Sequence, residues 1–491
     1  MIYVYLNGHD FEYDVRELLK VFFFNEDIIF IHSKDEYEGR SLLIESILSN
    51  DNGQLSSTTV VYKDGELIAS QYVKNIKDIK IEQDDVKKKV KMGIKQSIYD
   101  ILIQISEISA PWGILTGIRP IKIVHSLMDK GVDNRKIFHI LTHEYRLFSD
   151  KARLILDICK RQRKYIYPLD ESRFSLYVSI PFCPTRCLYC SFPTCNVSKY
   201  GEYIDEYTDR LIYEISMIGD MMKGKNISTV YFGGGTPTAI PVNNLENIIQ
   251  SVYKYFGYDN IKEITVEAGR PDTIDRQMLE MLNQNNVERI SINPQSMNDH
   301  TLKLIGRDHT SKDIVNAYYL AREIGFEVIN MDLIIGLPSE GLCEIRNTLH
   351  KIKKLDPENL TVHTLSVKRG SKFKETMDKY QINSQRIINE MLESTMEYAR
   401  YMNLKPYYLY RQKQILGNLE NIGYSKEDKE CIYNIIMMEE KETVIAAGMG
   451  GVSKIFYPKE DRIERVPNVK SLKEYLDRVE EMVERKRNLL S

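Results

Sequence analysis

The sequence predicts an α/β protein whose centre is a parallel β-sheet made of six strand–helix units. Two observations predict it. From about residue 174 to 367, short apolar runs alternate with helix-length amphipathic segments. In addition, the polar and glycine-rich motifs come directly after those apolar runs. We expect an N-terminal α/β domain of unknown role (1–165), the central domain (166–390) and a mainly helical C-terminal cap (391–491).

The central domain has six predicted strands, and helix-length segments such as 203–222 and 245–255 separate them. Parallel strands need crossover connections of this length, so the sheet is either open or closed into a partial barrel. In such sheets ligands bind at the carboxyl ends of the strands, within the following loops. The predicted strands are 176–180, 229–232, 263–266, 289–292, 328–333 and 359–365.

The flanking domains show different patterns. Residues 58–62 and 67–73 alternate like the strands of a hairpin, and the segments 84–105 and 151–164 have helical periodicity. From about residue 390 the chain is expected to be helical and to cover the barrel mouth. This region includes the tyrosines 407, 408 and 410, a glycine run at 446–455 and a charged helix at 472–488.

Composition limits the classes of function. The 491 residues are 43% hydrophobic and 28% charged, which is ordinary for a globular protein. The net charge of −3 argues against a nucleic-acid partner. The N-terminus also lacks the pattern of a signal peptide. We expect a cytoplasmic protein with no membrane association. The odd number of cysteines, seven in a chain of this length, argues against a disulfide framework. Four of the seven lie between residues 183 and 195, which indicates metal or redox chemistry.

The segment YVSIPFCPTRCLYCSF starts in the first central strand and places Cys183, Cys187 and Cys190 at C-x3-C-x2-C spacing. Thiolates are the usual ligands of iron–sulfur clusters, and three of them leave one iron of a 4Fe–4S cubane open. The alternative is a structural zinc site with Cys195 or a histidine as its fourth ligand. Zinc sites more often pair two C-x2-C knuckles, and the sequence has no second pair. An iron–sulfur cluster is therefore favoured.

Further motifs follow the next strands. The segment YFGGGTPT brings Gly234, Gly235 and Thr236 to the end of the second strand, where glycines let a ligand approach the backbone. Single polar residues follow later strands, and each alone would be a turn or cap residue. Together they indicate a site for a polar cofactor: Glu267, Gln295, Asp332 and Arg307. Arg307 could neutralise a carboxylate of that cofactor, or it could be a solvated surface residue.

In this order the motifs YVSIPFCPTRCLYC, YFGGGTPT, ITVEAGRPDT, SINPQSMND, TLKLIGRDHT and NMDLIIGLP resemble the radical S-adenosylmethionine (SAM) superfamily. Within it they are similar to the oxygen-independent coproporphyrinogen III oxidase family and its HemZ-type coproporphyrinogen dehydrogenases. The resemblance covers about residues 174–340 and implies a partial (β/α)6 radical SAM barrel, a 4Fe–4S cluster and SAM. It further implies conversion of coproporphyrinogen III to protoporphyrinogen IX through a 5′-deoxyadenosyl radical, with flavodoxin or ferredoxin as electron donor.

The resemblance also implies residue roles. The three cysteines hold the cluster, and Tyr177 lies near the SAM carboxylate. Tyr189 packs over the cofactor. The other expected contacts are Gly234, Gly235 and Thr236 to the methionine groups, Glu267 to the primary SAM, and Gln295, Arg307 and Asp332 to a second SAM-like ligand. Where the best-known branch of the family has a further cysteine, this chain has Phe192, so we do not expect Cys195 to be a ligand.

Three other functions remain open: porphyrin modification by methyl transfer or ring opening, which related proteins perform with the same barrel, a haem chaperone, and RNA modification. A related haem chaperone has the same barrel but carries an HN-x-x-YW stretch, whereas this chain reads LYRQKQILGNLENIGY at residues 409–424. The absence of that histidine and tryptophan favours the enzyme. RNA modification, with residues 1–165 as the RNA-binding domain, is disfavoured by the net charge.

Overall fold

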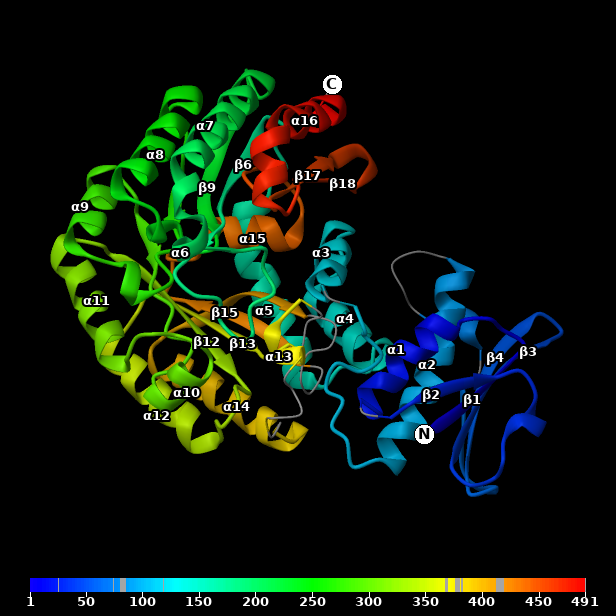
Figure 1. Ribbon diagram of the computed structural model, residues 1–491. Helices are drawn as coiled ribbons and strands as arrows, with labels where there is room; N and C mark the ends of the chain where they lie inside the picture. The colour runs from blue at the N-terminus through cyan, green and yellow to red at the C-terminus, as the bar shows by residue number, and fades with distance from the viewer. Residues whose placement is uncertain are drawn as a thin grey trace. The chain divides into compact units, whose positions relative to one another are not determined.

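The structure is a computed structural model (Figure 1). It describes residues 1–24, 26–73, 75–79, 85–117, 119–366, 370–375, 380, 383–411 and 419–490. Contacts divide the chain into two compact units, Met1–Cys159 and Lys160–Ser491. Across the described ranges no helix is both long and apolar enough to cross a bilayer.

The first unit contains a five-stranded sheet of order β2-β1-β3-β4-β5. The predicted hairpin is confirmed as β4 and β5, whereas the sequence analysis missed the other three strands. The predicted helix 84–105 is α2, which begins at Val86; residue 84 lies outside the described residues. The elements are β1 (Ile2–Asn7), α1 (Glu12–Phe22), β2 (Ile28–Ile31), β3 (Leu42–Asp51), β4 (Gln54–Lys63), β5 (Glu66–Val73), α2 (Val86–Ile105), α3 (Ile121–Asp129) and α4 (Asn134–His139). The helix α5 (Ser149–Ile166) begins in the first unit and ends in the second.

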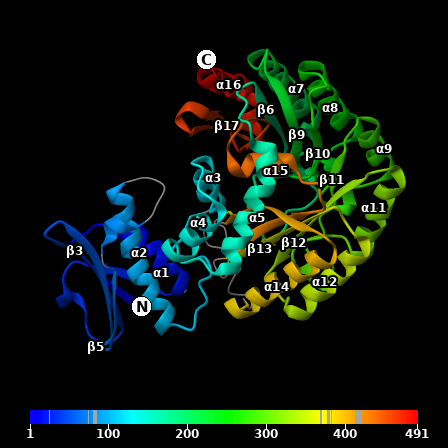
Figure 2. The same ribbon diagram turned by 180° about the vertical axis from the view of Figure 1, so that it is seen from behind.

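The second unit is built on the predicted parallel sheet. All six predicted strands are present and pair in chain order, β6-β9-β10-β11-β12-β13. Views from opposite sides show the crossover helices on the outer, convex face of this curved sheet (Figures 1 and 2). The strands are β6 (Arg173–Ile180), β9 (Asn226–Gly234), β10 (Glu263–Val266), β11 (Arg289–Ser291), β12 (Val328–Ile335) and β13 (Asn359–Thr364); the helices are α7 (Ile204–Met221), α8 (Val242–Phe256), α9 (Arg276–Gln284), α11 (Ser311–Ile324) and α12 (Leu342–Leu355).

The C-terminal segment extends this sheet at both edges, so the expectation of a mainly helical cap missed five strands. The antiparallel pair β14 and β15 joins β13, while β16 pairs in parallel with β6 and leads to β17 and β18. Aromatic residues favour strands, and the tyrosines at 407, 408 and 410 lie on β14 rather than on a helix. The elements are α14 (Gln385–Tyr401), β14 (Lys405–Arg411), β15 (Glu420–Ser425), α15 (Ile432–Glu439), β16 (Thr443–Ala447), β17 (Val452–Tyr457), β18 (Arg462–Pro467) and α16 (Leu472–Leu490).

A buried ion pair fastens α16 to the barrel. Lys486 and Glu214 are both fully buried, and their Nζ and Oε1 atoms are 2.7 Å apart. The other carboxylate oxygen of Glu214 accepts hydrogen bonds from the Gly448 N–H at 2.7 Å and the Tyr475 hydroxyl at 2.6 Å. Because both charges are satisfied by hydrogen bonds, their burial is compensated. The pair therefore fixes the glycine run beside β6, the strand that leads into the cysteine motif.

Candidate active site

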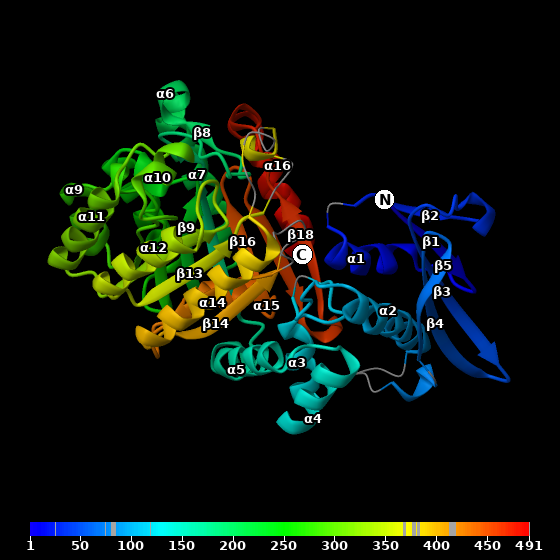
Figure 3. The same ribbon diagram turned by 90° about the horizontal axis from the view of Figure 1, so that it is seen from below.

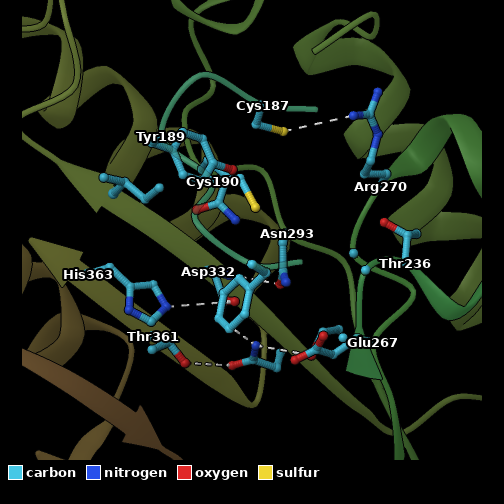
Figure 4. Close-up of a pocket in the computed structure, with 18 of the residues that line it drawn as sticks. Cys187, Tyr189, Cys190, Thr236, Glu267, Arg270, Asn293, Asp332, Thr361 and His363 are labelled. Atoms are coloured by element: carbon cyan, nitrogen blue, oxygen red, sulfur yellow. Dashed lines mark hydrogen bonds and ion pairs between the residues drawn. The ribbon is translucent and has the colours of Figure 1, made fainter. Parts of the chain in front are cut away.

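The three motif cysteines line one cavity of about 380 Å³ in the second unit (Figure 4). They follow β6 on the loop that begins with the short strand β7 (Phe182–Cys183). Cys195 is not among the lining residues. It lies on β8 (Cys195–Asn196), is paired with Phe182 and is buried, and Figure 3 shows β8 and the following α6 (Val197–Tyr200) at one end of the barrel. The loop therefore separates the three spaced cysteines from the fourth.

Hydrogen bonds to distant segments hold the cysteine loop in place. The Leu188 N–H donates to the Ile305 carbonyl at 2.9 Å, and the Thr185 hydroxyl donates to the Gly306 carbonyl at 2.9 Å. On the other side the Asn196 side chain donates to the Pro184 carbonyl at 2.8 Å. A loop without regular structure is thus positioned by the barrel around it.

The donor set fits a cluster better than a zinc ion. In the described part of the chain, no three His, Cys, Asp or Glu side chains are grouped so that they could hold one metal ion. A cubane differs in this respect, because its thiolates bind separate irons and need not surround one centre. Three thiols that line one cavity without converging on a point therefore suit a 4Fe–4S cluster with one open iron.

A buried arginine adds positive charge beside the thiols. Arg270 is 2% exposed and its Nη1 lies 3.9 Å from the Cys187 sulfur. The same guanidinium forms two hydrogen bonds to Asp272, at 2.9 and 2.8 Å, and one to the Thr185 hydroxyl at 2.8 Å. Burial would raise the pKa of Asp272, but hydrogen bonds from His309 and Arg270 outweigh it and hold that pKa well below the ordinary value. Positive charge of this kind favours thiolates over thiols.

The glycine motif packs directly against the backbone that leads into the cysteine loop. A Cβ at Gly235 would lie 2.6 Å from the Phe182 carbonyl oxygen, and one at Gly234 would lie 2.8 Å from the Ser179 hydroxyl. The backbone N–H groups of Gly235 and Thr236 donate to the Ile180 and Phe182 carbonyls, each at 2.8 Å. Only glycine permits this contact. The Thr236 hydroxyl also lies 3.6 Å from the Cys183 sulfur.

Glu267 is a half-buried carboxyl group on the cavity wall. Burial raises its pKa to about 7, and the neighbouring Asp332 charge adds to that effect. Its Oε1 accepts a hydrogen bond from the Tyr231 hydroxyl at 2.5 Å, which acts in the opposite direction. At neutral pH the group is thus poised between its charged and neutral forms, a property typical of functional sites.

Gln295 and Arg307 line the cavity, and each has one buried side-chain atom without a hydrogen-bond partner among the described residues. Both are buried, at 7% and 6% exposure. The Gln295 Oε1 and the Arg307 Nε have no hydrogen-bond partner among the residues that the structure describes. The Gln295 backbone is also in the left-handed region, with φ of 62°, while its N–H donates to the Asp332 carbonyl at 2.8 Å. Buried polar atoms without partners are costly, so these atoms indicate a polar ligand.

Asp332 is the second carboxylate of the wall. Its Oδ1 accepts a hydrogen bond from the Asn330 side chain at 2.8 Å, and its Oδ2 lies 3.8 Å from the His363 ring. Burial would raise its pKa, but the nearby His363 ring and the hydrogen bond from Asn330 lower it below the ordinary value. Asp332 is therefore ionised where Glu267 is only partly so.

Of the twelve predicted site residues, eleven line the cavity and Tyr177 does not. Tyr177 packs against Tyr231 and Tyr433, with ring centroids 6.2 and 6.1 Å apart. Tyr189 lines the cavity beside the cysteines, and burial raises its pKa. Arg307 is a buried residue and not the solvated surface residue that the sequence also allowed.

The chain is similar in sequence to a known protein family and to several characterised proteins. The radical SAM superfamily profile matches residues 177–352. The "Oxygen-independent coproporphyrinogen-III oxidase-like protein HemZ" of Bacillus subtilis (strain 168) is 41% identical over 404 residues, which are 81% of this chain and 81% of the relative. The chain belongs to this family of radical SAM proteins. Accordingly it is a radical SAM enzyme that uses a 4Fe–4S cluster and SAM.

Other relatives within the superfamily match less of the chain. The "Heme chaperone HemW" of Bacillus subtilis (strain 168) is 33% identical over 43% of this chain and 55% of its own length. The "Oxygen-independent coproporphyrinogen III oxidase" of Escherichia coli (strain K12) is 32% identical over 40% of this chain and 42% of its own length. The chain thus spans about half the length of these two. The solved structure of the Escherichia coli enzyme HemN shares the fold, with a TM-score of 0.52 and 22% identity over 66% of this chain and 73% of that one.

Several cavity residues of this radical SAM barrel were missed by the sequence analysis. Arg270 lies within the quoted motif ITVEAGRPDT but carried no signal of its own, because its partners Thr185 and Asp272 are recognised only in three dimensions. His363 and Thr361 were assigned only to a strand, where alternation would have shown that they share a face.

Proposed function

We propose that this radical SAM enzyme converts coproporphyrinogen III to protoporphyrinogen IX by oxygen-independent oxidative decarboxylation. One observation carries the proposal: in a chain 41% identical to a coproporphyrinogen-III oxidase-like protein, three thiols and two half-buried carboxyl groups line a single cavity. When bound, the cluster and SAM supply one-electron chemistry that yields a 5′-deoxyadenosyl radical.

Each propionate side chain is oxidised to a vinyl group by the loss of a hydrogen atom, carbon dioxide and one electron. One hydrogen atom is removed from the β-carbon of the side chain, the bond to the carboxylate breaks, and carbon dioxide leaves. The remaining electron passes to an external one-electron acceptor, and a vinyl group is left. A separate low-potential donor of the flavodoxin or ferredoxin class provides the electron that starts the reaction.

The chain's own residues would bind and orient these groups. Cys183, Cys187 and Cys190 hold the cluster, and Arg270 places a positive charge 3.9 Å from the Cys187 sulfur. The expected contacts to SAM come from the glycine loop and from the polar wall: Gly234, Gly235, Thr236, Glu267, Gln295, Arg307 and Asp332, with Tyr189 packed alongside. Tyr177 would act through its contact with Tyr231.

The second candidate is a haem chaperone, because HemW proteins are among the relatives. The chaperone motif HN-x-x-YW has no counterpart in residues 409–424, although 412–418 of that stretch lie outside the described residues. The HemZ-like relative also covers 81% of this chain against 43% for the chaperone, which supports the enzyme.

Anaerobic turnover distinguishes the two. Reconstituted protein is incubated with SAM, a reductant and coproporphyrinogen III, and the tetrapyrrole mass is measured. The enzyme should form 5′-deoxyadenosine together with a product lighter by two formic-acid equivalents. An unchanged tetrapyrrole with tight, stoichiometric haem binding would instead establish the chaperone and contradict the proposal.

A further inference from the structure

His363 lies on the cavity wall opposite the cysteine loop, and no motif of the resemblance contains it. It projects from β13 towards Asp332 on the neighbouring strand β12 (Figure 4). Its Nδ1 is 3.1 Å from the Tyr410 hydroxyl on β14. The ring therefore bridges a phenol on one side and a carboxylate on the other.

The Asp332 carboxylate is held at both oxygens by a chain of side chains. The Thr361 hydroxyl donates to the side-chain Oδ1 of Asn330 at 3.2 Å, and the Asn330 Nδ2 donates to Asp332 Oδ1 at 2.8 Å. His363 Nε2 approaches Oδ2 at 3.8 Å. These contacts occupy one side of the carboxylate, while the residue itself lines the cavity.

The partners determine the tautomer of His363. Asp332 is ionised, because the nearby His363 ring and the hydrogen bond from Asn330 outweigh the effect of burial and keep its pKa below the ordinary value. An ionised carboxylate only accepts hydrogen bonds, so the proton of the neutral ring belongs on Nε2. Nδ1 then accepts from the Tyr410 hydroxyl. The phenol thus fixes the tautomer that the carboxylate requires, as outer partners do for metal-bound histidines.

We propose that His363 is a positioning residue for SAM: with Tyr410 it holds Asp332 so that the free lone pairs of the carboxylate accept hydrogen bonds from hydroxyl or ammonium groups of the cofactor. The proposal rests on the cofactor and not on the identity of the tetrapyrrole. Carboxylates positioned in this way bind ribose hydroxyls in other nucleotide sites. The charged or titratable groups that face the ring are Asp332, Glu267 and Tyr410.

Amide replacements of His363 test the contributions of its two ring nitrogens, Nδ1 and Nε2, one at a time. In His363→Gln the side-chain amide takes the place of Nε2 and keeps a donor towards Asp332. In His363→Asn the amide takes the place of Nδ1 and withdraws that donor. Tyr410→Phe removes the hydroxyl alone. His350→Asn is the matched control, because His350 is exposed on α12, away from the cavity.

SAM affinity is measured by anaerobic equilibrium dialysis on reconstituted protein without tetrapyrrole, with iron and sulfide content determined for each variant. His363→Asn should weaken SAM binding about tenfold, Tyr410→Phe about threefold, and His363→Gln less than threefold. The His350 variant should bind SAM as the native protein does. All variants should load the same amount of cluster.

Three results would overturn the proposal. They are native SAM affinity in His363→Asn, equal losses in the Asn and Gln variants, and a higher KM for the tetrapyrrole with unchanged SAM affinity. The last would make His363 a substrate contact. Because the dialysis contains no tetrapyrrole, its outcome is independent of the decarboxylation assay, so failure of one proposal is distinguishable from failure of the other.

Discussion

Gly235→Ala tests whether the glycine motif positions the cysteine loop. The new Cβ would lie 2.6 Å from the Phe182 carbonyl oxygen, whereas ordinary contact begins at 3.4 Å, so the two backbones must separate by 0.8 Å (3.4 minus 2.6). That separation stretches two hydrogen bonds of 2.8 Å, from Gly235 to Ile180 and from Thr236 to Phe182. Overpacking of this kind costs about 1–3 kcal/mol, and each weakened hydrogen bond about 1 kcal/mol more.

Because Phe182 directly precedes Cys183, the displacement reaches the first cluster ligand. We therefore expect Gly235→Ala to lose both apoprotein stability and cluster content after identical reconstitution. Denaturant unfolding of the apoprotein measures the first, and iron and sulfide analysis measures the second. The matched control is Gly269→Ala, whose Cβ would meet only the Asn293 amide at 3.6 Å. The control should load cluster normally and be neutral or slightly more stable.

The reasoning is refuted if Gly235→Ala matches the native protein in unfolding free energy and in iron content. It is also refuted if Gly269→Ala loses cluster to the same extent, because any added methyl group near the cavity would then have the effect. A loss of stability with full cluster content would show that the loop accommodates the displacement.

Three further changes have defined outcomes. Cys183→Ala should abolish the cluster absorption and Cys195→Ala should leave it intact, since only the first lines the cavity; equal losses would restore Cys195 as a ligand. Lys486→Met should destabilise the protein by about 3–5 kcal/mol in denaturant unfolding, because the Glu214 carboxylate would be left buried without its ion-pair partner. Adding Glu214→Gln should recover part of that loss, and no recovery would argue against the buried charge as the cause. The pKa of Glu267 is raised from 4.5 to about 7 by burial, so its stabilising contribution is complete below pH 4.5 and is lost as the pH rises through about 7. Thermal unfolding of apoprotein should therefore show Glu267→Gln gaining on the native protein from about pH 5 to about pH 8, and a constant difference would contradict the raised pKa.

The sequence predicted the central sheet because its strands are buried on both faces and read as apolar runs. Each of the six begins within three residues of the predicted position. The motif residues lie at the carboxyl ends of the strands or in the loops that follow, except that Tyr177 lies within β6 and Asp332 within β12. Two of the missed C-terminal strands, β15 and β16, pair with strands far away in the sequence, β13 and β6. Residues 405–411 become a strand by pairing with β15, which in turn pairs with β13, and no local pattern in the sequence reveals those partners.

The candidate site was predictable where chemistry is encoded in residue spacing. Three cysteines within eight residues are such a pattern. Arg270 was not predictable from spacing, because it reaches Cys187 across 83 positions of the chain. His363 was missed for a similar reason, since its role depends on Asp332 and Tyr410 from two other strands. Spacing therefore identifies the ligands of a cluster, whereas the charges that tune it depend on the tertiary fold.

The glycine motif connects these two levels. In the sequence it suggested only that a ligand approaches the backbone, and that interpretation leaves the number of glycines unexplained. In the structure Gly234 and Gly235 have no room for a Cβ because the residues before Cys183 occupy that space. Neighbouring parallel strands, β6 and β9, bring the two loops together at their carboxyl ends. The cysteine motif and the glycine motif are thus two halves of one packing contact, and a chain that keeps the first in this geometry needs the second.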